Sequence, residues 1–330
     1  MSGARRSMEY GAHLPLIEFE GAGRTLADLR AYARGAAALG YRYLCANDHL
    51  LFGRPWLDGP TALAATIEAS ADMTLATTVC LPVVRGPVQT AKMLAAIDIL
   101  SGGRLVAGVG PGSSPLDYAA IGVPFEERWR RFDEAIRTLR SLLGENAESF
   151  TGNFYSTEGL SLEPPPSSPS GPPIWIASWG SPAGLRRVAR LGDGWLASGY
   201  NTTPSGFGES LARLHEELAA PRASRGAFPN GIVTMWLYVS EARRDAERML
   251  GEVLAPMLNR PVEVLRDLAL PIGSAEQCAE RISAYQDAGA ERIFVWPLAD
   301  ELHQLERFRE DVLPLVPATE DPPNAAKRSP

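Results

Sequence analysis

The segment LSGGRLVAGVGPG (Leu100–Gly112) contains a Ser-Gly-Gly turn, the apolar run Leu105–Val109, and glycines at 108, 110 and 112. This pattern is typical of a strand that ends in a loop, where glycine allows close contacts that a β-carbon forbids. A dinucleotide fingerprint requires G-x-G-x-x-G at the start of a helix. Here Ser113 stands where the third glycine belongs. The loop therefore does not satisfy the fingerprint, and the surrounding chain must explain it.

Short apolar segments alternate with helical patterns on both sides of this stretch. Strands are predicted at residues 8–14, 41–46, 73–80, 104–110, 174–177, 194–198, 232–239 and 293–296. Helices are predicted at residues 26–39, 60–70, 87–100, 126–143, 182–191, 204–219, 274–288 and 302–313, with a helical insertion at 241–272. Eight strand–helix units favour a closed (β/α)8 TIM barrel over an open doubly wound sheet.

Three connecting segments carry further expectations. Residues 111–125 are predicted to be irregular, and residues 150–162 to form a hairpin. Asp98 and Arg104 flank the Ser-Gly-Gly turn, where a structural salt bridge is expected.

The bulk composition limits the class of protein. A chain of 330 residues with 45% hydrophobic and 22% charged residues has enough apolar sequence for one large barrel domain. We expect a single domain at 8–316, a flexible N-terminal tail at 1–7 and a disordered C-terminal tail at 317–330. A net charge of -7 argues against a nucleic-acid partner.

Targeting and cysteine patterns favour a cytoplasmic protein. No apolar run approaches the roughly 20 residues of a membrane span, and no signal peptide is recognisable. Cys45, Cys80 and Cys278 are odd in number and widely spaced, as in a reducing compartment. We therefore expect the protein to act on a small molecule and not to associate with a membrane.

In such a barrel, ligands bind at the carboxyl ends of the strands. The corresponding residues are His13–Leu14, Asp48–His49, Thr78–Pro82, Gly108–Ser113, Ser178–Ser181, Ser198–Asn201, Tyr238 and Trp296–Pro297. No metal is expected, because the four histidines include no H-E-x-x-H motif and zinc catalysis needs three ligands. The chain also lacks the G-x-S-x-G motif of serine hydrolases.

The pair Asp48–His49 is the candidate for proton transfer, because histidine titrates near neutral pH. Both side chains enter a pocket only if the chain bends after Asp48, since neighbours on a strand face opposite ways. The alternative is that Asp48 holds the loop while His49 packs on Trp56.

The sequence Ser178-Trp179-Gly180-Ser181 precedes Pro182 and is a candidate anion site at a helix start. Simple capping by Ser181 is equally compatible with it. Trp179 and Trp296 are interpreted either as pocket walls or as packing at the barrel top. The charged run at 126–133 is interpreted as a solvated helix face.

Six segments in order resemble the bacterial luciferase-like family of flavin- and deazaflavin-dependent oxidoreductases. They are LGYRYLCANDHLL (39–51), the run from ATTVCLP to VGPG (76–112), GVPFEERWRRFDEAI (122–136), FTGNFYS (150–156), PPIWIAS (172–178) and GDGWL (192–196). The segment LPIGSAEQCAERISAYQDAGAERIFVWPL (270–298) is similar to the family's closing pattern.

The resemblance implies a luciferase-like TIM barrel that holds coenzyme F-420 or, alternatively, FMN. It implies a non-prolyl cis peptide at Thr78–Val79 against the ring and a phosphate held by Ser178–Ser181 and Ser198–Gly199. Gly108 and Gly110 would lie at the floor of the barrel mouth. Catalysis is assigned to His49, which relays a proton or stabilises charge, and to Asp48, which orients it. Substrate contacts are assigned to His13, Trp56, Ser113 and Trp296.

One departure concerns the substrate. Sugar-phosphate dehydrogenases of the family carry an acidic residue after the fourth strand, where this chain has Ser113, and the nearest acid is Asp117. The overall pattern is closest to the deazaflavin branch, so hydride transfer between F-420 and a small organic molecule is predicted. A two-component FMNH2-dependent monooxygenase and a non-catalytic flavin-binding barrel are the alternatives. The family further implies a homodimer, with a separate flavin or deazaflavin reductase as a possible partner.

Overall fold

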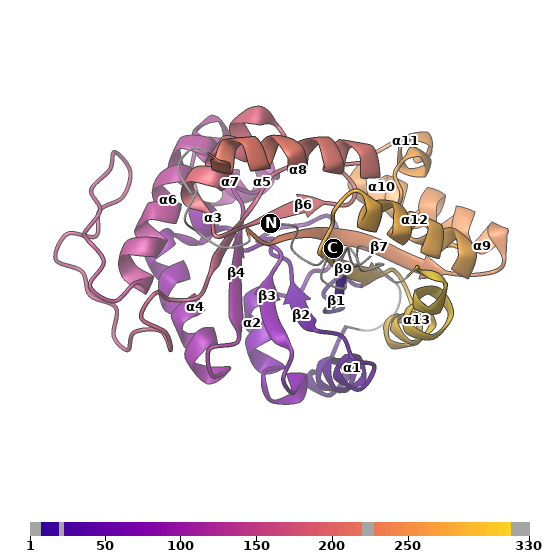
Figure 1. Cartoon of the computed structure of the whole chain (residues 1–330). Helices are drawn as coiled ribbons and strands as arrows, with labels where there is room; N and C mark the ends of the chain where they lie inside the picture. The colour runs from indigo at the N-terminus through magenta and orange to yellow at the C-terminus, as the bar shows by residue number, and fades with distance from the viewer. Residues whose placement is uncertain (1–7, 20–22, 220–227, 318–330) are drawn as a thin grey trace, which may run out of the picture.

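Eight parallel strands form a closed barrel in the computed structural model, which describes residues 8–19, 23–219 and 228–317 (Figure 1). The barrel strands are β1 (Glu9–His13), β2 (Tyr43–Ala46), β3 (Thr74–Thr77), β4 (Leu105–Val109), β5 (Ile174–Ala177), β6 (Gly194–Ser198), β7 (Asn230–Val239) and β9 (Arg292–Pro297). Pairings of β6 with β7, β7 with β9, and β9 with β1 close the barrel. The short β8 (Ile272–Gly273) extends the far end of β7. The predicted (β/α)8 fold is confirmed.

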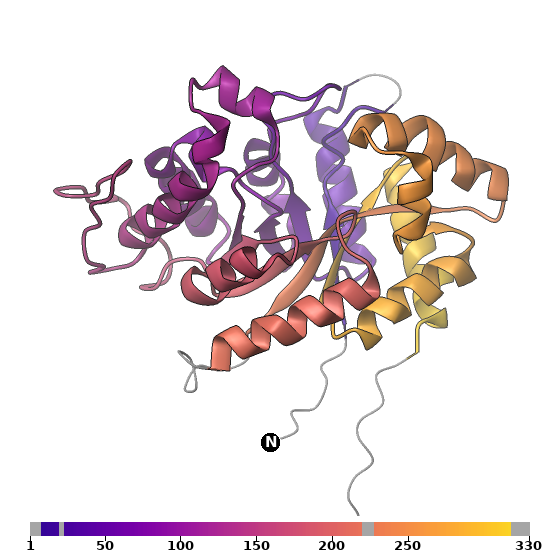
Figure 2. The same cartoon turned by 90° about the horizontal axis from the view of Figure 1, so that it is seen from above.

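Helices surround the barrel, as Figures 1 and 2 show. The main ones are α1 (Leu26–Ala38), α2 (Gly59–Ala65), α4 (Pro87–Leu100), α6 (Arg128–Leu143), α7 (Pro182–Leu191), α8 (Pro204–Ala219), α12 (Ala275–Asp287) and α13 (Glu301–Arg307). Shorter helices are α3 (Pro82–Arg85), α5 (Pro115–Ala120), α9 (Arg243–Arg248), α10 (Ala255–Leu258) and α11 (Val262–Asp267), with a π-helical turn at Met249–Leu254.

Local sequence explains where several helices begin. Thr25 and Ser274 each form a capping box, with Asp28 and Gln277 respectively, at the starts of α1 and α12. Helices α9–α11 occupy the predicted insertion and cluster at one side of the barrel in both views. No helix within the described residues has the length and apolar character that crossing a membrane requires.

Three local expectations need correction. The segment 111–125 is not wholly irregular, because α5 lies within it. The expected hairpin at 150–162 is present only over residues 150–157, where Thr151 and Ser156 form an antiparallel bridge. Asp98 and Arg104 form no salt bridge: Arg104 donates hydrogen bonds to the carbonyls of Ser101 and Met73 instead. The predicted N-terminal tail, and nearly all of the C-terminal one, lie outside the described residues.

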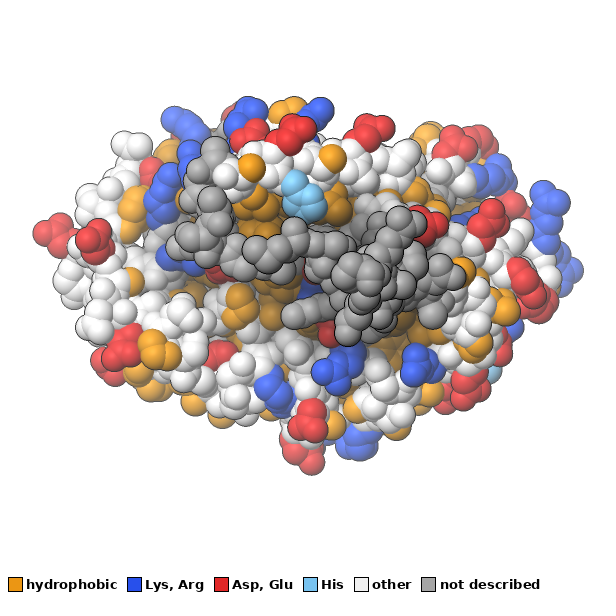
Figure 3. Space-filling model, in the orientation of Figure 1, with side chains coloured by type: hydrophobic (Ala, Val, Ile, Leu, Met, Phe, Trp, Pro, Cys, Tyr) orange, Lys and Arg blue, Asp and Glu red, His pale blue; other side chains and the backbone are white. Residues whose placement is uncertain are grey.

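Two apolar clusters hold the barrel together. The larger lies between the strands and the helices, where buried aliphatic side chains exclude water. The smaller fills the barrel interior and comprises Tyr43, Cys45, Ala76, Val106, Trp175, Leu196, Val233 and Phe294. On the face seen in Figure 3, acidic and basic side chains are interspersed, without a broad basic surface.

Glycine at position 108 in β4 makes a close approach between β3 and β4 possible. A β-carbon on Gly108 would lie 2.0 Å from the carbonyl oxygen of Thr77 and 2.7 Å from a methyl group of Leu196. The Thr77 hydroxyl also donates a 2.7 Å hydrogen bond to the carbonyl of Gly108. The two strands therefore touch through bare backbone at the carboxyl end of the barrel.

Replacing Gly108 with alanine is expected to lower the free energy of unfolding by about 1–3 kcal/mol, because the backbone must move to relieve the contact. Gly251→Ala is the matched control, because a β-carbon there meets nothing within 4 Å. That control is expected to be neutral or to stabilise the protein by up to about 1 kcal/mol. Urea denaturation measures both, and equal midpoints for Gly108→Ala and the wild-type protein would contradict this account.

Candidate functional site

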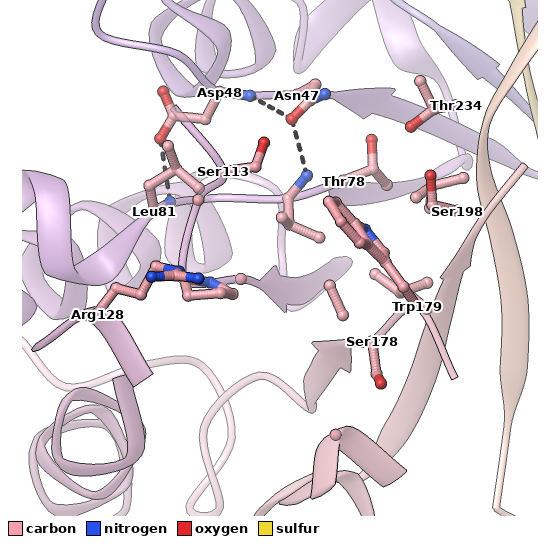
Figure 4. Close-up of a pocket in the computed structure, with 18 of the residues that line it drawn as sticks. Asn47, Asp48, Thr78, Leu81, Ser113, Arg128, Ser178, Trp179, Ser198 and Thr234 are labelled. Carbon is pink, nitrogen blue, oxygen red and sulfur yellow. Dashed lines mark hydrogen bonds between the residues drawn. The ribbon is translucent and has the colours of Figure 1, made fainter. Parts of the chain in front are cut away.

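A cavity of about 420 Å³ opens at the carboxyl ends of the strands (Figure 4). Its lining combines apolar and polar side chains from the loops after β2 to β6 and from β7. The lining residues are Asn47, Asp48, His49, Thr78, Val79, Leu81, Gly110, Pro111, Gly112, Ser113, Phe125, Arg128, Trp129, Ala177, Ser178, Trp179, Ser181, Gly184, Leu196, Ser198, Tyr200, Val233 and Thr234. The cavity lies on the interior cluster, since Leu196 and Val233 belong to both.

The segment after β3 forms one wall and is held from both sides. The amide of Thr78 donates to the carbonyl of Ala46 at 2.8 Å, and the amide of Cys80 donates to that of Gly108 at 2.9 Å. The peptide bond Thr78–Val79 is cis, as the family resemblance implied. Both residues line the cavity, so this peptide faces any bound ligand.

Asn47 was not identified by the sequence analysis and has a central structural role. Its side-chain oxygen Oδ1 accepts hydrogen bonds from the amides of Asp48, at 2.7 Å, and Val79, at 3.1 Å (Figure 4). The side chain therefore joins the end of β2 to the cis peptide. The available signal was its position as the first polar residue after a buried strand.

Asp48 does not orient His49, which corrects the expected role. Its carboxylate accepts hydrogen bonds from Arg85 Nε at 2.7 Å and Nη2 at 2.6 Å, and from the amide of Leu81 at 3.2 Å. The hydrogen bonds to Asp48 are the largest cause of a raised pKa at Arg85. With only 2% of its surface exposed, Asp48 is a buried ion-pair partner that fixes the loop after β3.

His49 is instead oriented by Asp117. Its Nδ1 lies 3.0 Å from Asp117 Oδ2, while Asp117 Oδ1 accepts the amide of Leu51 at 2.7 Å. A carboxylate can only accept at that contact, so the neutral ring carries its proton on Nδ1. His49 Nε2 makes no hydrogen bond with any described residue, and the ring lines the cavity.

The sequence does carry a local signal at Asp117, which the positions of strand ends do not single out. Ser114 caps α5 by accepting the amide of Asp117, and Pro115 occupies the first turn. The pattern Ser-x-x-Asp is typical of a helix start. Here the aspartate turns away from its own helix end and bonds His49, which sequence spacing alone does not reveal.

Of the four predicted substrate contacts, only Ser113 lines the cavity. His13 and Trp296 are each 1% exposed and stack on one another with ring centroids 3.4 Å apart. Trp56 does not line the cavity and packs edge-to-face on His49 and on Trp296, with ring centroids 4.8 Å and 5.5 Å apart respectively. Barrel-top packing is therefore the correct interpretation of Trp296, and the expected contact of His49 with Trp56 is also present.

Serines gather at the ends of β5 and β6. Ser178, Trp179, Ser181 and Ser198 line the cavity, whereas neither Gly180 nor Gly199 does. Ser181 also caps α7, accepting the amide of Gly184 at 3.2 Å. The capping interpretation is confirmed, and it places a hydroxyl and a helix N-terminus at this end of the cavity.

Two further expectations change in detail. Gly110 lines the cavity, but Gly108 does not, because its missing β-carbon makes room for Thr77 and Leu196 instead. The run at 126–133 is not simply a solvated face, since Arg128 lines the cavity with its guanidinium 3.9 Å from the ring centre of Phe125. Arg128 gives this rim a positive charge.

The cavity fits a flat coenzyme that carries a phosphate. Val79, Leu81, Leu196 and Val233 offer apolar surface, and Ser178, Ser181, Ser198 and Thr234 offer hydroxyl donors. A helix N-terminus and a guanidinium both favour an anion. No group of three or more metal-binding side chains occurs within the described residues.

Comparisons with known proteins agree with this geometry. Residues 9–260 match the model of the luciferase-like monooxygenase family. The chain belongs to that family.

Among its relatives, an F420-dependent hydroxymycolic acid dehydrogenase from Mycobacterium tuberculosis is 29% identical, over 87% of this chain and 83% of the relative. An FMNH(2)-dependent dimethylsulfone monooxygenase from Pseudomonas fluorescens is 24% identical, over 87% and 86%. A solved F420-dependent secondary alcohol dehydrogenase superposes with a TM-score of 0.80 at 16% identity, covering 94% of this chain and all of the other. Both coenzymes predicted from the sequence therefore occur among the relatives.

The buried His13 ring predicts a specific pH dependence of stability. Its Nε2 accepts the amide of Asn47, and burial lowers the pKa to about 3 from an ordinary 6.5. Between these values the unfolded chain binds a proton that the folded protein does not, so stability falls as the pH drops from about 6.5 towards 3. One such group contributes up to about 1.4 kcal/mol per pH unit.

His13→Gln is expected to remove this contribution to the pH slope, which is the change of unfolding free energy with pH. Urea denaturation at a series of pH values across this range measures that slope. The exposed His215→Gln is the control and is expected to keep the full slope. Equal slopes for wild-type protein and His13→Gln would refute a neutral buried ring.

Proposed function

We propose that this protein transfers hydride between coenzyme F-420 and a small alcohol or carbonyl compound. The observation that carries the proposal is the pair Asp117–His49: the His49 ring lines the cavity, its Nδ1 contacts Asp117, and its Nε2 makes no hydrogen bond with any described residue. Two relatives named as F420-dependent dehydrogenases support the choice of coenzyme and of substrate class.

Each part of the cavity has a distinct task in this proposal. When bound, the coenzyme supplies the hydride acceptor or donor. Ser178, Ser181 and Ser198 would hold its phosphate, and the segment Thr78–Val79 would support its ring. Asn47 and the Asp48–Arg85 ion pair keep that segment in place, so Asp48 acts as a positioning residue.

His49 moves the proton. In alcohol oxidation, hydride leaves the carbon and the hydroxyl proton passes to Nε2, which is free to accept because Nδ1 donates to Asp117. In carbonyl reduction the proton returns from Nε2 to the oxygen. The buried carboxylate of Asp117 stabilises the positively charged ring formed in between.

The sequence further predicts one domain at 8–316, a homodimer and a cytoplasmic location, and these remain part of the proposal. A separate flavin or deazaflavin reductase as a partner also remains part of the proposal.

Binding of coenzyme is the first test of the proposal. Titration of the purified protein with F-420 and with FMN, followed by fluorescence, is expected to show saturable binding of F-420 in preference to FMN. Tight binding of reduced FMN together with oxygen uptake would instead select the monooxygenase alternative. Binding of neither coenzyme would refute the proposal.

His49→Gln is expected to slow alcohol-dependent reduction of F-420 by about 10²- to 10⁴-fold, because no proton acceptor remains. Its coenzyme affinity should change little, since the phosphate and ring contacts are intact. Asp117→Asn is expected to slow the reaction tenfold or more, since an amide that donates to Nδ1 places the proton on Nε2.

Stopped-flow absorbance with a panel of secondary alcohols measures these rates. The exposed His303→Gln serves as the control for replacing a histidine with glutamine. A normal rate in His49→Gln, with coenzyme still bound, would point to a different proton acceptor or to the non-catalytic alternative.

A further inference from the structure

A second cavity, of about 490 Å³, adjoins the proposed phosphate end of the first. It lies between the loops after β5 and β6, the first turns of α8, and the insertion. We name it the outer groove; its lining residues are Trp179, Gly180, Asn201, Thr202, Thr203, Gly206, Glu209, Ser210, Arg213, Arg260 and Leu268. Trp179 lines both cavities and has 57% of its surface exposed, so the two are separated by little more than one side chain.

The loop after β5 lies tightly against α8 at this point. A β-carbon on Gly180 would lie 2.4 Å from the hydroxyl oxygen of Ser210, and the residue has a φ of +89°. Only glycine satisfies both conditions without strain. The serines that would hold a phosphate and the first turns of α8 are therefore neighbours.

Two arginines give the outer groove a positive charge within an acidic protein of net charge -7. Arg260 donates to the carbonyl of Tyr200 and to the side-chain oxygen of Asn201, and its guanidinium lies 5.2 Å from the ring centre of Tyr200. These bonds fix the guanidinium without neutralising it. Among the described residues, Arg213 has no hydrogen bond or ion pair, and the one carboxylate in the groove is Glu209.

We propose that the outer groove binds a chain of carboxylates that continues from the coenzyme phosphate. The inference rests on the proposed function, because it needs a phosphate near Ser178 and Ser181. The matching ligand chemistry is the γ-linked oligoglutamate tail by which F-420 extends beyond its phosphate. FMN ends at its phosphate and leaves the groove unused, so the groove favours the deazaflavin coenzyme.

Three features fit this ligand class. Guanidinium groups bind carboxylates well, and the groove holds two of them, on Arg213 and Arg260, while Thr202, Thr203 and Ser210 add hydroxyl groups. The groove is open to solvent, so a flexible chain of variable length can extend out of it. Because Arg213 is exposed, its contribution is expected to weaken as salt screens it.

The test compares F-420 that carries several glutamates with the same coenzyme trimmed to remove them, using fluorescence titration at low and high salt. Wild-type protein is expected to bind the glutamylated form more tightly, with a preference that shrinks at high salt. Arg213→Gln is expected to weaken binding of that form by about two- to fivefold and to leave the trimmed form unchanged. Glu209→Gln is expected to strengthen binding of the glutamylated form only.

Arg186→Gln is the matched control, because Arg186 is an exposed arginine on α7 that does not line the groove. It is expected to keep the preference of the wild-type protein. Equal affinity for both forms in wild-type protein, or equal losses in Arg213→Gln and Arg186→Gln, would overturn this inference while leaving the proposed function intact. Binding of neither form would overturn both.

Discussion

The site depends on one constraint, which is that the three residues after β3 are held between the ends of β2 and β4. The amides of Thr78, Val79 and Cys80 each donate to a neighbour: the Ala46 carbonyl, the Asn47 side chain and the Gly108 carbonyl. On the β4 side, this requires bare backbone at Gly108. A buried segment whose amides are all paired is costly to move, so it presents a fixed surface to a ligand.

Two buried aspartates have different roles beside that surface. Asp48 pairs with Arg85 and accepts the amide of Leu81, whereas Asp117 contacts Nδ1 of His49 and leaves Nε2 without a hydrogen bond to any described residue. Both are at most 2% exposed, so their charges are compensated by fixed partners. The Asp48–Arg85 pair fixes the loop after β3, which forms one wall of the cavity. The Asp117 contact sets the tautomer of His49. Neither role follows from the residue type alone.

The barrel could be predicted from the sequence because strand and helix periodicities and helix caps are local properties, and the strand and helix assignments largely agree with the structure. The location of the cavity could be predicted only from strand ends, and Asp48, His49, Thr78 and Ser178 do line it. Side-chain direction was not predictable: His13 and Trp296 also lie at the carboxyl ends of strands, yet they stack inside the protein. The Asp117–His49 contact joins residues 68 positions apart, and such a long-range pairing leaves no periodic trace.

The most direct test of the account is a crystal structure of the protein with saturating F-420. The account predicts the ring against the Thr78–Val79 peptide, with its reacting face towards His49 Nε2, and the phosphate within hydrogen-bond distance of Ser178 and Ser181. A coenzyme bound elsewhere, or one with its phosphate at the His49 end of the cavity, would contradict the central claim.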